Sequence, residues 1–192
     1  MNYSKTNTEN GFALLLALII SSVVLAIGVS LLNISVNQIN LSTTARESEF
    51  AFQASHAGID CMSYWRSEKA SAYTSSTTAT ANPSVNCFTK APQTTSKTVL
   101  SQVAGQSVSY KYTNVFEWGS PLRCTSVDMY VMNAYNQQIT LPFANKAVGT
   151  NGSKVCKVGN TCTVLISDGY NRACGEIGTS IFSIQRELTV EF

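Results

Sequence analysis

The stretch FALLLALIISSVVLAIGVSLL, Phe12–Leu32, contains no charged residue and decides the fold class of the chain. Asp, Glu, Lys, Arg and His are absent from the whole interval between Glu9 and Arg46. As a helix that rises about 1.5 Å per residue, Phe12–Leu32 is roughly 31 Å long, which is the thickness of a bilayer's hydrocarbon core. The sequence therefore predicts one membrane-spanning helix over residues 12–32.

A secretory signal peptide is the alternative interpretation of this stretch. The apolar run is longer than the roughly 7 to 15 residues of a signal-peptide core, and no A-x-A cleavage site follows it before Arg46. Cleavage by the ordinary signal peptidase is therefore disfavoured. Lys5 and the initiator amine oppose Glu9 on the amino-terminal side, a weak positive-inside signal. We expect a single-pass protein of the cytoplasmic membrane whose domain after Leu32 is extracytoplasmic.

Composition narrows the possible functions. The chain has 192 residues, with 13 Lys or Arg, 11 Asp or Glu and a formal net charge of +2. Only 12% of the residues are charged, against roughly 25% in an average soluble domain. The few basic residues form no cluster, which argues against a nucleic-acid surface. The six cysteines form an even set and indicate an oxidising compartment.

The helical pattern continues beyond the membrane stretch, since no proline occurs before Pro83. We expect one helix from Phe12 to about Arg66, with a membrane half at 12–32 and an amphipathic half at 33–66. A stripe at helical spacing is predicted to pack on a domain, formed by Phe50, Ala54, Ala57, Cys61 and Trp65. A second, polar stripe consists of Asn33, Asn37, Asn40 and Thr44.

The rest of the chain divides into a loop and a sheet. Residues 67–98 are rich in Ser and Thr and predict a long loop with no core of its own, with one short ordered piece around 85–88. Over 99–192, alternating apolar residues predict strands near 108–112, 127–131, 163–166 and 184–192. The expected fold class is α+β, with the outer half of the long helix packed on a small antiparallel sheet.

Six cysteines allow 15 connectivities, and the sequence alone does not choose among them. The segment VCKVGNTCTV resembles a hairpin that would bring Cys156 opposite Cys162. Cys61 on the packed stripe is placed to bind Cys87 in the loop, which leaves Cys124 with Cys174. A bond between Cys162 and Cys174 is the alternative that would overturn this set.

The sequence offers no catalytic constellation, and we expect neither enzymatic activity nor a cofactor. The single histidine, His56, is four residues before Asp60, and a helical contact between them is the expected role. The spacings of Cys156, Cys162 and Cys174 do not match a zinc site. Three acidic residues are conceivable Ca²⁺ ligands on loops, but they lack the spacing of a calcium loop: Glu117, Asp128 and Asp168.

The amino-terminal region resembles the prepilins of type IV pili and of pseudopili. A short polar leader, 1–11, ends in Gly11, and Phe12 opens an uncharged helix that continues into a soluble half. The stretch ARESEFAFQASHAG, Ala45–Gly58, is similar to the corresponding segment of PilX-like minor pilins. The resemblance implies that a prepilin peptidase cuts after Gly11 and methylates the new amino terminus at Phe12. It also implies membrane lipid and other pilins or pseudopilins as partners of the helix.

The chain departs from this family at one residue that bears on where a subunit can lie in a filament. Major pilins carry Glu at the fifth mature position, where it meets the amino terminus of a neighbouring subunit, whereas this chain has Leu16. An unpaired buried amine is costly, so a filament of this chain alone is hard to build. The expectation is a minor subunit at or near the filament tip, for assembly initiation or surface contact. The alternative is a bitopic, membrane-anchored binding module that does not assemble.

A contact loop is the last expectation. In pilins, a disulfide near the carboxy terminus commonly delimits a loop that faces solvent or partners. Here such a bond to Cys174 would enclose ISDGYNRA, in which Tyr170, Asn171 and Arg172 resemble a subunit-contact or adhesive tip. An ordinary polar turn is the other interpretation of these three residues.

Overall fold

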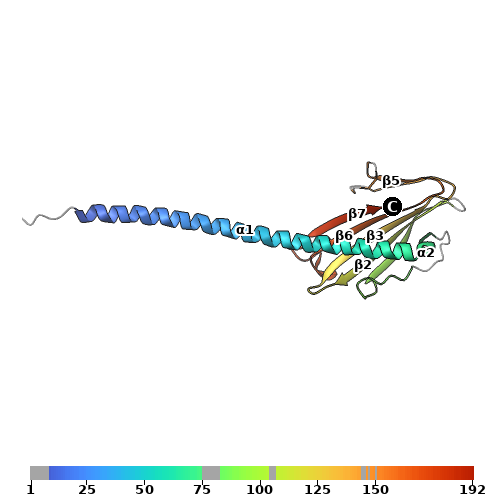
Figure 1. Cartoon of the computed structure of the whole chain (residues 1–192), viewed down its shortest axis with the longest axis horizontal. Coiled ribbons are helices and arrows are strands. Elements are labelled where there is room, and N and C mark those ends of the chain that lie inside the picture. The colour runs from blue at the N-terminus through green and yellow to red at the C-terminus, as the bar shows by residue number, and fades with distance from the viewer. Residues whose placement is uncertain (1–8, 75–82, 104–106, 144–145, 147, 150) are drawn as a thin grey trace, which may run out of the picture. The chain divides into compact units, whose positions relative to one another are not determined.

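The computed structural model describes residues 9–74, 83–103, 107–143, 146, 148–149 and 151–192. The chain divides into two compact units, Met1–Arg46 and Glu47–Phe192. The helices are α1 (Glu9–Glu68), α2 (Ala70–Thr74) and the 3₁₀ turn η1 (Cys174–Glu176). The strands are β1 (Thr94–Val103), β2 (Ser107–Trp118), β3 (Arg123–Asn133), β4 (Ile139–Pro142), β5 (Ser153–Cys156), β6 (Thr161–Tyr170) and β7 (Gln185–Glu191) (Figure 1).

The helix α1 contributes residues to both units. It begins three residues before the expected start at Phe12 and ends two residues after Arg66. The described residues of the first unit, 9–46, belong entirely to α1. Residues 1–8 of the expected leader lie outside the described part of the chain. A helix of this length follows from an interval without proline in which Leu, Ile, Ala and Val predominate.

The second unit contains a five-stranded sheet of order β1-β2-β3-β6-β7, and every neighbouring pair is antiparallel. The structure therefore confirms an α+β fold with a long helix and an antiparallel sheet. The alternating segments of the sequence correspond to β2, β3, β6 and β7. The strands β4 and β5 form a separate two-stranded sheet that the alternation did not reveal, because each is only four residues long.

The carboxy-terminal part of α1 packs on one face of the five-stranded sheet (Figure 1). The predicted stripe was centred one residue off, since only its Ala54 is fully buried, while Phe50, Ala57, Cys61 and Trp65 are partly exposed. The residues that face the sheet are Ala51, Ala54, Ser55, Gly58, Ile59, Met62 and Arg66. Most of these residues are small, so a search for large apolar side chains selected the flank of the contact rather than its centre.

Two glycines allow this helix to lie directly on the strands. A Cβ built on Gly58 of α1 would lie 2.5 Å from Ser167 Oγ and 2.5 Å from Thr125 Cγ2. A Cβ on Gly169 of β6 would overlap the backbone of α1. The Thr125 hydroxyl donates a hydrogen bond of 3.0 Å to the carbonyl oxygen of Ala54. The backbone of α1 therefore contacts the strands directly, in addition to the contacts between side chains.

The other face of the sheet is covered by the segment between β3 and β6, which contains β4 and β5. Its core includes Phe143, Val148 and Cys156, packed with Val164 and Ile166 of β6. Two ion pairs attach this segment to β7. Lys154 Nζ lies 2.6 Å from Glu191 Oε2, and Lys146 pairs with Glu187. The sheet consequently has a hydrophobic core on both faces.

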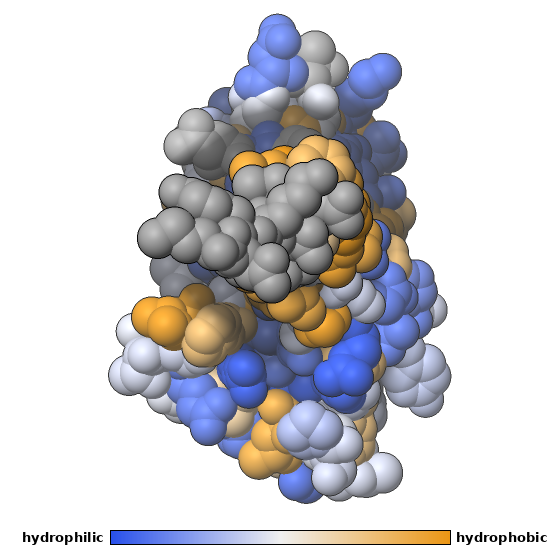
Figure 2. Space-filling model, turned by 90° about the vertical axis from the view of Figure 1, so that its left-hand side faces the viewer, coloured by the Kyte–Doolittle hydropathy of each residue, from blue (hydrophilic) through white to orange (hydrophobic). Residues whose placement is uncertain are grey.

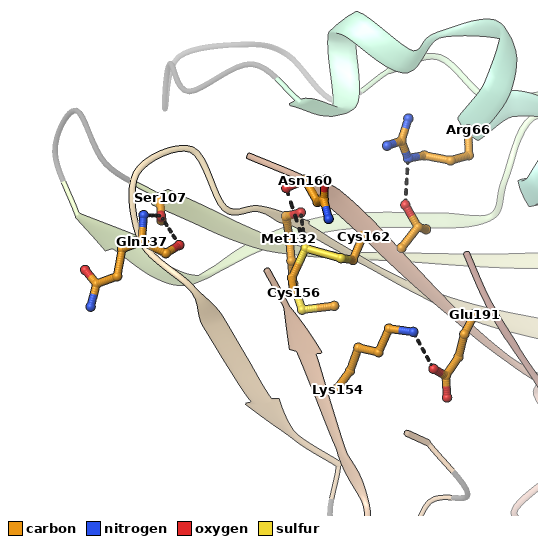
Figure 3. Close-up of a disulfide and its surroundings, with 10 residues drawn as sticks. Arg66, Ser107, Met132, Gln137, Lys154, Cys156, Asn160, Cys162 and Glu191 are labelled. Atoms are coloured by element: carbon orange, nitrogen blue, oxygen red, sulfur yellow. Dashed lines mark hydrogen bonds and ion pairs between the residues drawn. A yellow bond between two sulfur atoms is a disulfide. The ribbon is translucent and has the colours of Figure 1, made fainter. Parts of the chain in front are cut away.

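Three disulfides link Cys61 with Cys87, Cys124 with Cys174, and Cys156 with Cys162. These are the pairs that the sequence analysis favoured. The expected hairpin between Cys156 and Cys162 was wrong, however, because β5 pairs with β4, while β6 pairs with β3 and β7. This disulfide therefore joins two different sheets across the turn from Lys157 to Asn160 (Figure 3).

The expectation of a long, coreless loop over 67–98 was wrong in part, although the short ordered piece expected around 85–88 is present. It contains the helix α2, and β1 begins at Thr94. Tyr73, Val85 and Cys87 are buried in the same core as α1. Tyr73 packs edge to face on Tyr112 of β2, with ring centroids 5.0 Å apart. These burials depend on partners distant in the sequence, which local composition does not contain. Residues 75–82 of this loop lie outside the described part of the chain.

Candidate functional site

The amino-terminal part of α1 presents an apolar surface. All side chains from Phe12 to Arg46 are exposed in the structure, and mean hydropathy reaches 2.8 in an 18-residue window of this helix. By length and composition, the helix is a candidate membrane span. Viewed from the amino-terminal end of α1, orange apolar side chains lie around the helix (Figure 2). A surface of this kind requires lipid or a protein partner to remove it from water.

Four hydroxyl side chains of this segment are bonded within the helix itself. Ser22 Oγ donates a hydrogen bond of 2.8 Å to the carbonyl oxygen of Ile19, and Ser35 Oγ donates one of 2.9 Å to that of Leu31. Thr43 and Thr44 make the same type of bond to carbonyl groups four residues earlier. These hydroxyls therefore find partners within their own helix and need no water.

The two residues of the expected cleavage site lie in the first turn of α1, which begins at Glu9. The peptide bond between Gly11 and Phe12 is thus part of a helix in this structure. The Phe12 side chain is 71% exposed and that of Leu16 is 47% exposed. Leu16 is four residues after Phe12 and hence on the same helical face, one turn further along.

The three residues of the expected contact loop lie at the end of β6 and at the border of the sheet, where Tyr170 and Arg172 are partly exposed. Tyr170 is the last residue of β6 and pairs with Gln185 of β7. Asn171 is only 5% exposed, and the carbonyl oxygen of Arg172 accepts a hydrogen bond of 2.7 Å from the amide of Cys124. These residues are therefore parts of the sheet and its border, and Asn171 is too deeply buried to contact a partner.

Asn171 instead organises the end of the sheet at which α1 enters the second unit. Its Nδ2 donates to Glu47 Oε2 at 2.9 Å and to the carbonyl oxygen of Phe182 at 3.1 Å. Its Oδ1 accepts a hydrogen bond of 2.8 Å from the amide of Ile184. A buried amide that uses both ends in this way fixes a loop more strongly than a single contact would.

The loop that Asn171 holds carries two strongly exposed large apolar residues of the second unit. Ile181 is 89% exposed and Phe182 is 67% exposed. The loop is ordered by its own bonds, since the amide of Thr179 donates to Glu176 and that of Ser183 donates to Ser180. The sequence analysis missed this pair. The available signal was two adjacent large apolar residues in an otherwise polar, Gly- and Ser-containing turn.

The acidic residues considered as calcium ligands lie on strands and have other partners. Asp128 Oδ2 lies 2.8 Å from Lys111 Nζ, and Asp168 accepts a hydrogen bond of 2.7 Å from Gln185. Although burial favours the neutral amine, the hydrogen bond and charge of Asp128 raise the pKa of Lys111 above its ordinary value. Glu117 accepts a hydrogen bond of 2.7 Å from the amide of Cys174.

The described part of the chain contains no cluster of side chains arranged to bind a metal ion. Within the described residues, no group of three or more His, Cys, Asp or Glu side chains is placed to hold one. The expected helical contact is present, with His56 Nδ1 lying 3.1 Å from Asp60 Oδ2.

The candidate site is a surface for association with lipid or protein. It consists of the apolar part of α1 and the exposed pair Ile181 and Phe182 in the second unit. Comparison of the chain with protein-family models, with curated proteins and with solved structures finds no match.

Proposed function

We propose that this chain is a minor pilin or pseudopilin, stored in the membrane and incorporated into a type IV pilus-like filament at or near its tip. The observation that carries the proposal is the exposed apolar surface of α1 from Phe12 to Leu41, which directly follows Gly11. A helix of this kind dissolves in lipid before assembly. It can then pack on similar helices in a filament, an exchange of one apolar environment for another.

The disulfides of the second unit support an extracytoplasmic location. All three cysteine pairs are oxidised, and no described cysteine is free. Disulfides of this density are typical of proteins that fold outside the cytosol. The soluble unit would thus lie on the outer side of the membrane, with the apolar helix as its anchor and later as its attachment to other subunits.

Leu16 supports a position at the tip. After cleavage at Gly11, the new amino terminus of Phe12 would carry a positive charge into an apolar helix bundle. A neighbour's carboxylate can pair with it, but Leu16 offers no carboxylate in return to a following subunit. One copy at the end of a filament satisfies this asymmetry, whereas a stack of identical copies leaves every amine unpaired.

The mass of the mature amino terminus tests this proposal. We expect the chain, expressed with a prepilin peptidase, to lose residues 1–11 and to gain one methyl group on Phe12. The variant Gly11→Val should remain uncut, because a branched side chain replaces the glycine before the scissile bond. The matched control Gly28→Val leaves the leader unchanged and should still be cut. An intact Met1 in the wild-type chain would contradict the proposal and favour a membrane-anchored binding module.

A further inference from the structure

Arg66, in the last turn of α1, carries a buried positive charge. Its Nε donates a hydrogen bond of 3.0 Å to Thr163 Oγ1 of β6, the dashed line beside Arg66 in Figure 3. The side chains of ten of the 11 acidic residues of the sequence, all except Glu9, lie in the described part of the chain. Within that part, no ion pair joins Arg66 to a carboxylate. Among the described residues, the Thr163 hydroxyl is thus the one side chain that accepts a hydrogen bond from the Arg66 guanidinium.

Three tyrosines form a cluster on the same side of the sheet. Tyr110 and Tyr112 alternate along β2 and face the same core as Tyr73 of α2. Ring centroids are 5.0 Å apart for Tyr73 and Tyr112, and 6.2 Å apart for Tyr110 and Tyr112. All three hydroxyls are buried and have no hydrogen-bond partner within the described residues. A buried hydroxyl without a partner is costly, so three in one cluster need an explanation.

A second cation lies on this cluster. Lys97 Nζ of β1 is 4.2 Å from the ring centroid of Tyr110 and 5.7 Å from that of Tyr112. Among the described residues, Lys97 forms no ion pair. The cluster therefore combines two cationic side chains and three phenol groups, contributed by α1, α2, β1 and β2, without an acidic side chain to balance them.

The guanidinium of Arg66 and the three phenol groups act as hydrogen-bond donors at neutral pH. Burial, assisted by the neighbouring Tyr110, raises the pKa of Tyr112 to about 12, and burial also raises the pKa of Tyr73. Both phenols consequently keep their protons. Burial lowers the pKa of Arg66, yet a guanidinium stays protonated in proteins. Tyr110 of β2 pairs with Val131 of β3, and Val131 pairs with Thr163 of β6, the residue that accepts the Arg66 hydrogen bond. Directly paired residues of a sheet point to the same face, so Arg66 and the tyrosines of β2 lie on one face of the sheet.

We propose that Arg66, Tyr73 and Tyr112, supported by Tyr110 and Lys97, bind a small monovalent anion, either chloride or the carboxylate of a small acid such as formate. A single negative charge balances the buried guanidinium, and the phenol groups supply the remaining hydrogen bonds. The bound anion would join the end of α1 to α2 and β2. This site is independent of filament assembly, so the proposed function and the anion site can fail separately.

The test uses the full chain in detergent micelles. Ionic strength is held constant with a bulky organic anion, while chloride or formate is varied. We expect the thermal unfolding midpoint to rise and then saturate with either small anion, as binding to the folded state requires. The chlorine-35 NMR line of chloride should broaden in the presence of the protein, and formate should narrow it again by competition.

Two variants separate a bound anion from general salt effects. Arg66→Met should abolish both the saturation and the line broadening, whereas Lys157→Met removes an exposed charge and should preserve both. Tyr112→Phe should weaken anion affinity several-fold while it stabilises the protein in the absence of small anions, because it removes a buried hydroxyl without a partner. A wild-type midpoint that does not saturate, or broadening that persists in Arg66→Met, would overturn the proposal and favour internal water as the partner.

Discussion

Gly169 of β6 lies directly beneath Ala51 of α1. A Cβ on Gly169 would overlap the Ala51 carbonyl oxygen and the Ser55 amide nitrogen, and would lie 2.8 Å from the carbonyl carbon of Ala54. A glycine inside a strand often marks such a close approach of two backbones. The contact sets the distance between the helix and the sheet, on which the rest of the core depends.

The first prediction follows from this contact. Gly169→Ala should lower the free energy of unfolding by about 3 kcal/mol, because backbone atoms of a helix cannot move aside as a side chain can. Denaturant unfolding of the full chain in micelles measures the loss. Gly178→Ala is the matched control, since a Cβ there meets nothing within 4 Å, and it should change stability little. Equal stability of the two variants would contradict the packing described.

The three disulfides should contribute unequally to stability. They span 50 residues for Cys124–Cys174, 26 for Cys61–Cys87 and 6 for Cys156–Cys162. The entropy of loop closure predicts stabilisation of about 4, 3.5 and 2 kcal/mol in that order. Paired Cys→Ala variants, each compared with the wild-type chain by denaturant unfolding, check this order. The reverse order would mean that strain or local packing outweighs the restriction of the unfolded chain.

Acid should weaken the attachment of the β4–β5 segment to β7. The hydrogen bond from Lys154, together with that from the amide of Gly149, lowers the pKa of Glu191 below its ordinary value. The ionised carboxylate therefore stabilises the folded state above about pH 4.5. That contribution is lost as the pH falls through the lowered pKa of the folded state.

Glu191→Gln tests this dependence. The variant should be less stable than the wild type at pH 7, and its unfolding midpoint should fall less between pH 5 and pH 3, pH values chosen to bracket the titration. Glu68→Gln, at an exposed position on α1, is the control and should keep the wild-type pH profile. Parallel profiles for wild type and Glu191→Gln would show that this carboxylate does not couple to folding. The effect is modest because the pair is partly exposed to solvent.

Leu16 should determine where the chain sits in a filament, if the proposed function holds. Leu16→Glu supplies the carboxylate that a following subunit's amine needs, so it should increase the number of copies per filament several-fold. Leu18→Glu introduces the same charge two residues further along, where it faces a different direction, and should reduce incorporation. Quantitative immunoblotting of sheared filaments measures both. Unchanged copy number in Leu16→Glu would remove the argument for a tip position.

The exposed pair Ile181 and Phe182 should contribute to partner contact. Replacing both by Ser removes apolar surface without disturbing the core, since both side chains are largely exposed. We expect unchanged thermal stability but a several-fold loss of incorporation into filaments. Val158→Ser, at an exposed turn between β5 and β6, is the matched control and should behave like the wild type. Wild-type incorporation of the double variant would exclude this loop as a contact.

Some features were predictable because they depend on local sequence. The absence of charge and proline over Phe12–Leu32 predicts a long apolar helix without reference to any partner. Alternation along β2 and β3 reflects strands on which one face is more deeply buried than the other. The even number of cysteines predicted an oxidised set, although the hairpin expected for Cys156 and Cys162 does not form. In each case, the signal is carried by residues adjacent in sequence or by a simple count.

Other features depended on contacts between distant residues. Cys156 and Cys162 are six residues apart, yet they bridge two sheets, because β5 finds its partner in β4. Asn171 looked like part of a contact tip, but its bonds to Glu47 and Phe182 bury it. No local pattern distinguishes a polar residue in solvent from one that closes a loop.

The sequence alone thus determined that this protein has an uncharged amino-terminal helix, an antiparallel sheet and an oxidised set of cysteines, because composition and periodicity are properties of the chain itself. The tertiary structure decided which helix face meets the sheet, since backbone contact at Gly58 and Gly169 favours small residues over large apolar ones. It also brought Arg66 to the face of the sheet that carries Tyr110 and Tyr112, from elements separated by up to 46 residues, where burial turns an ordinary basic residue into a charge that needs a partner.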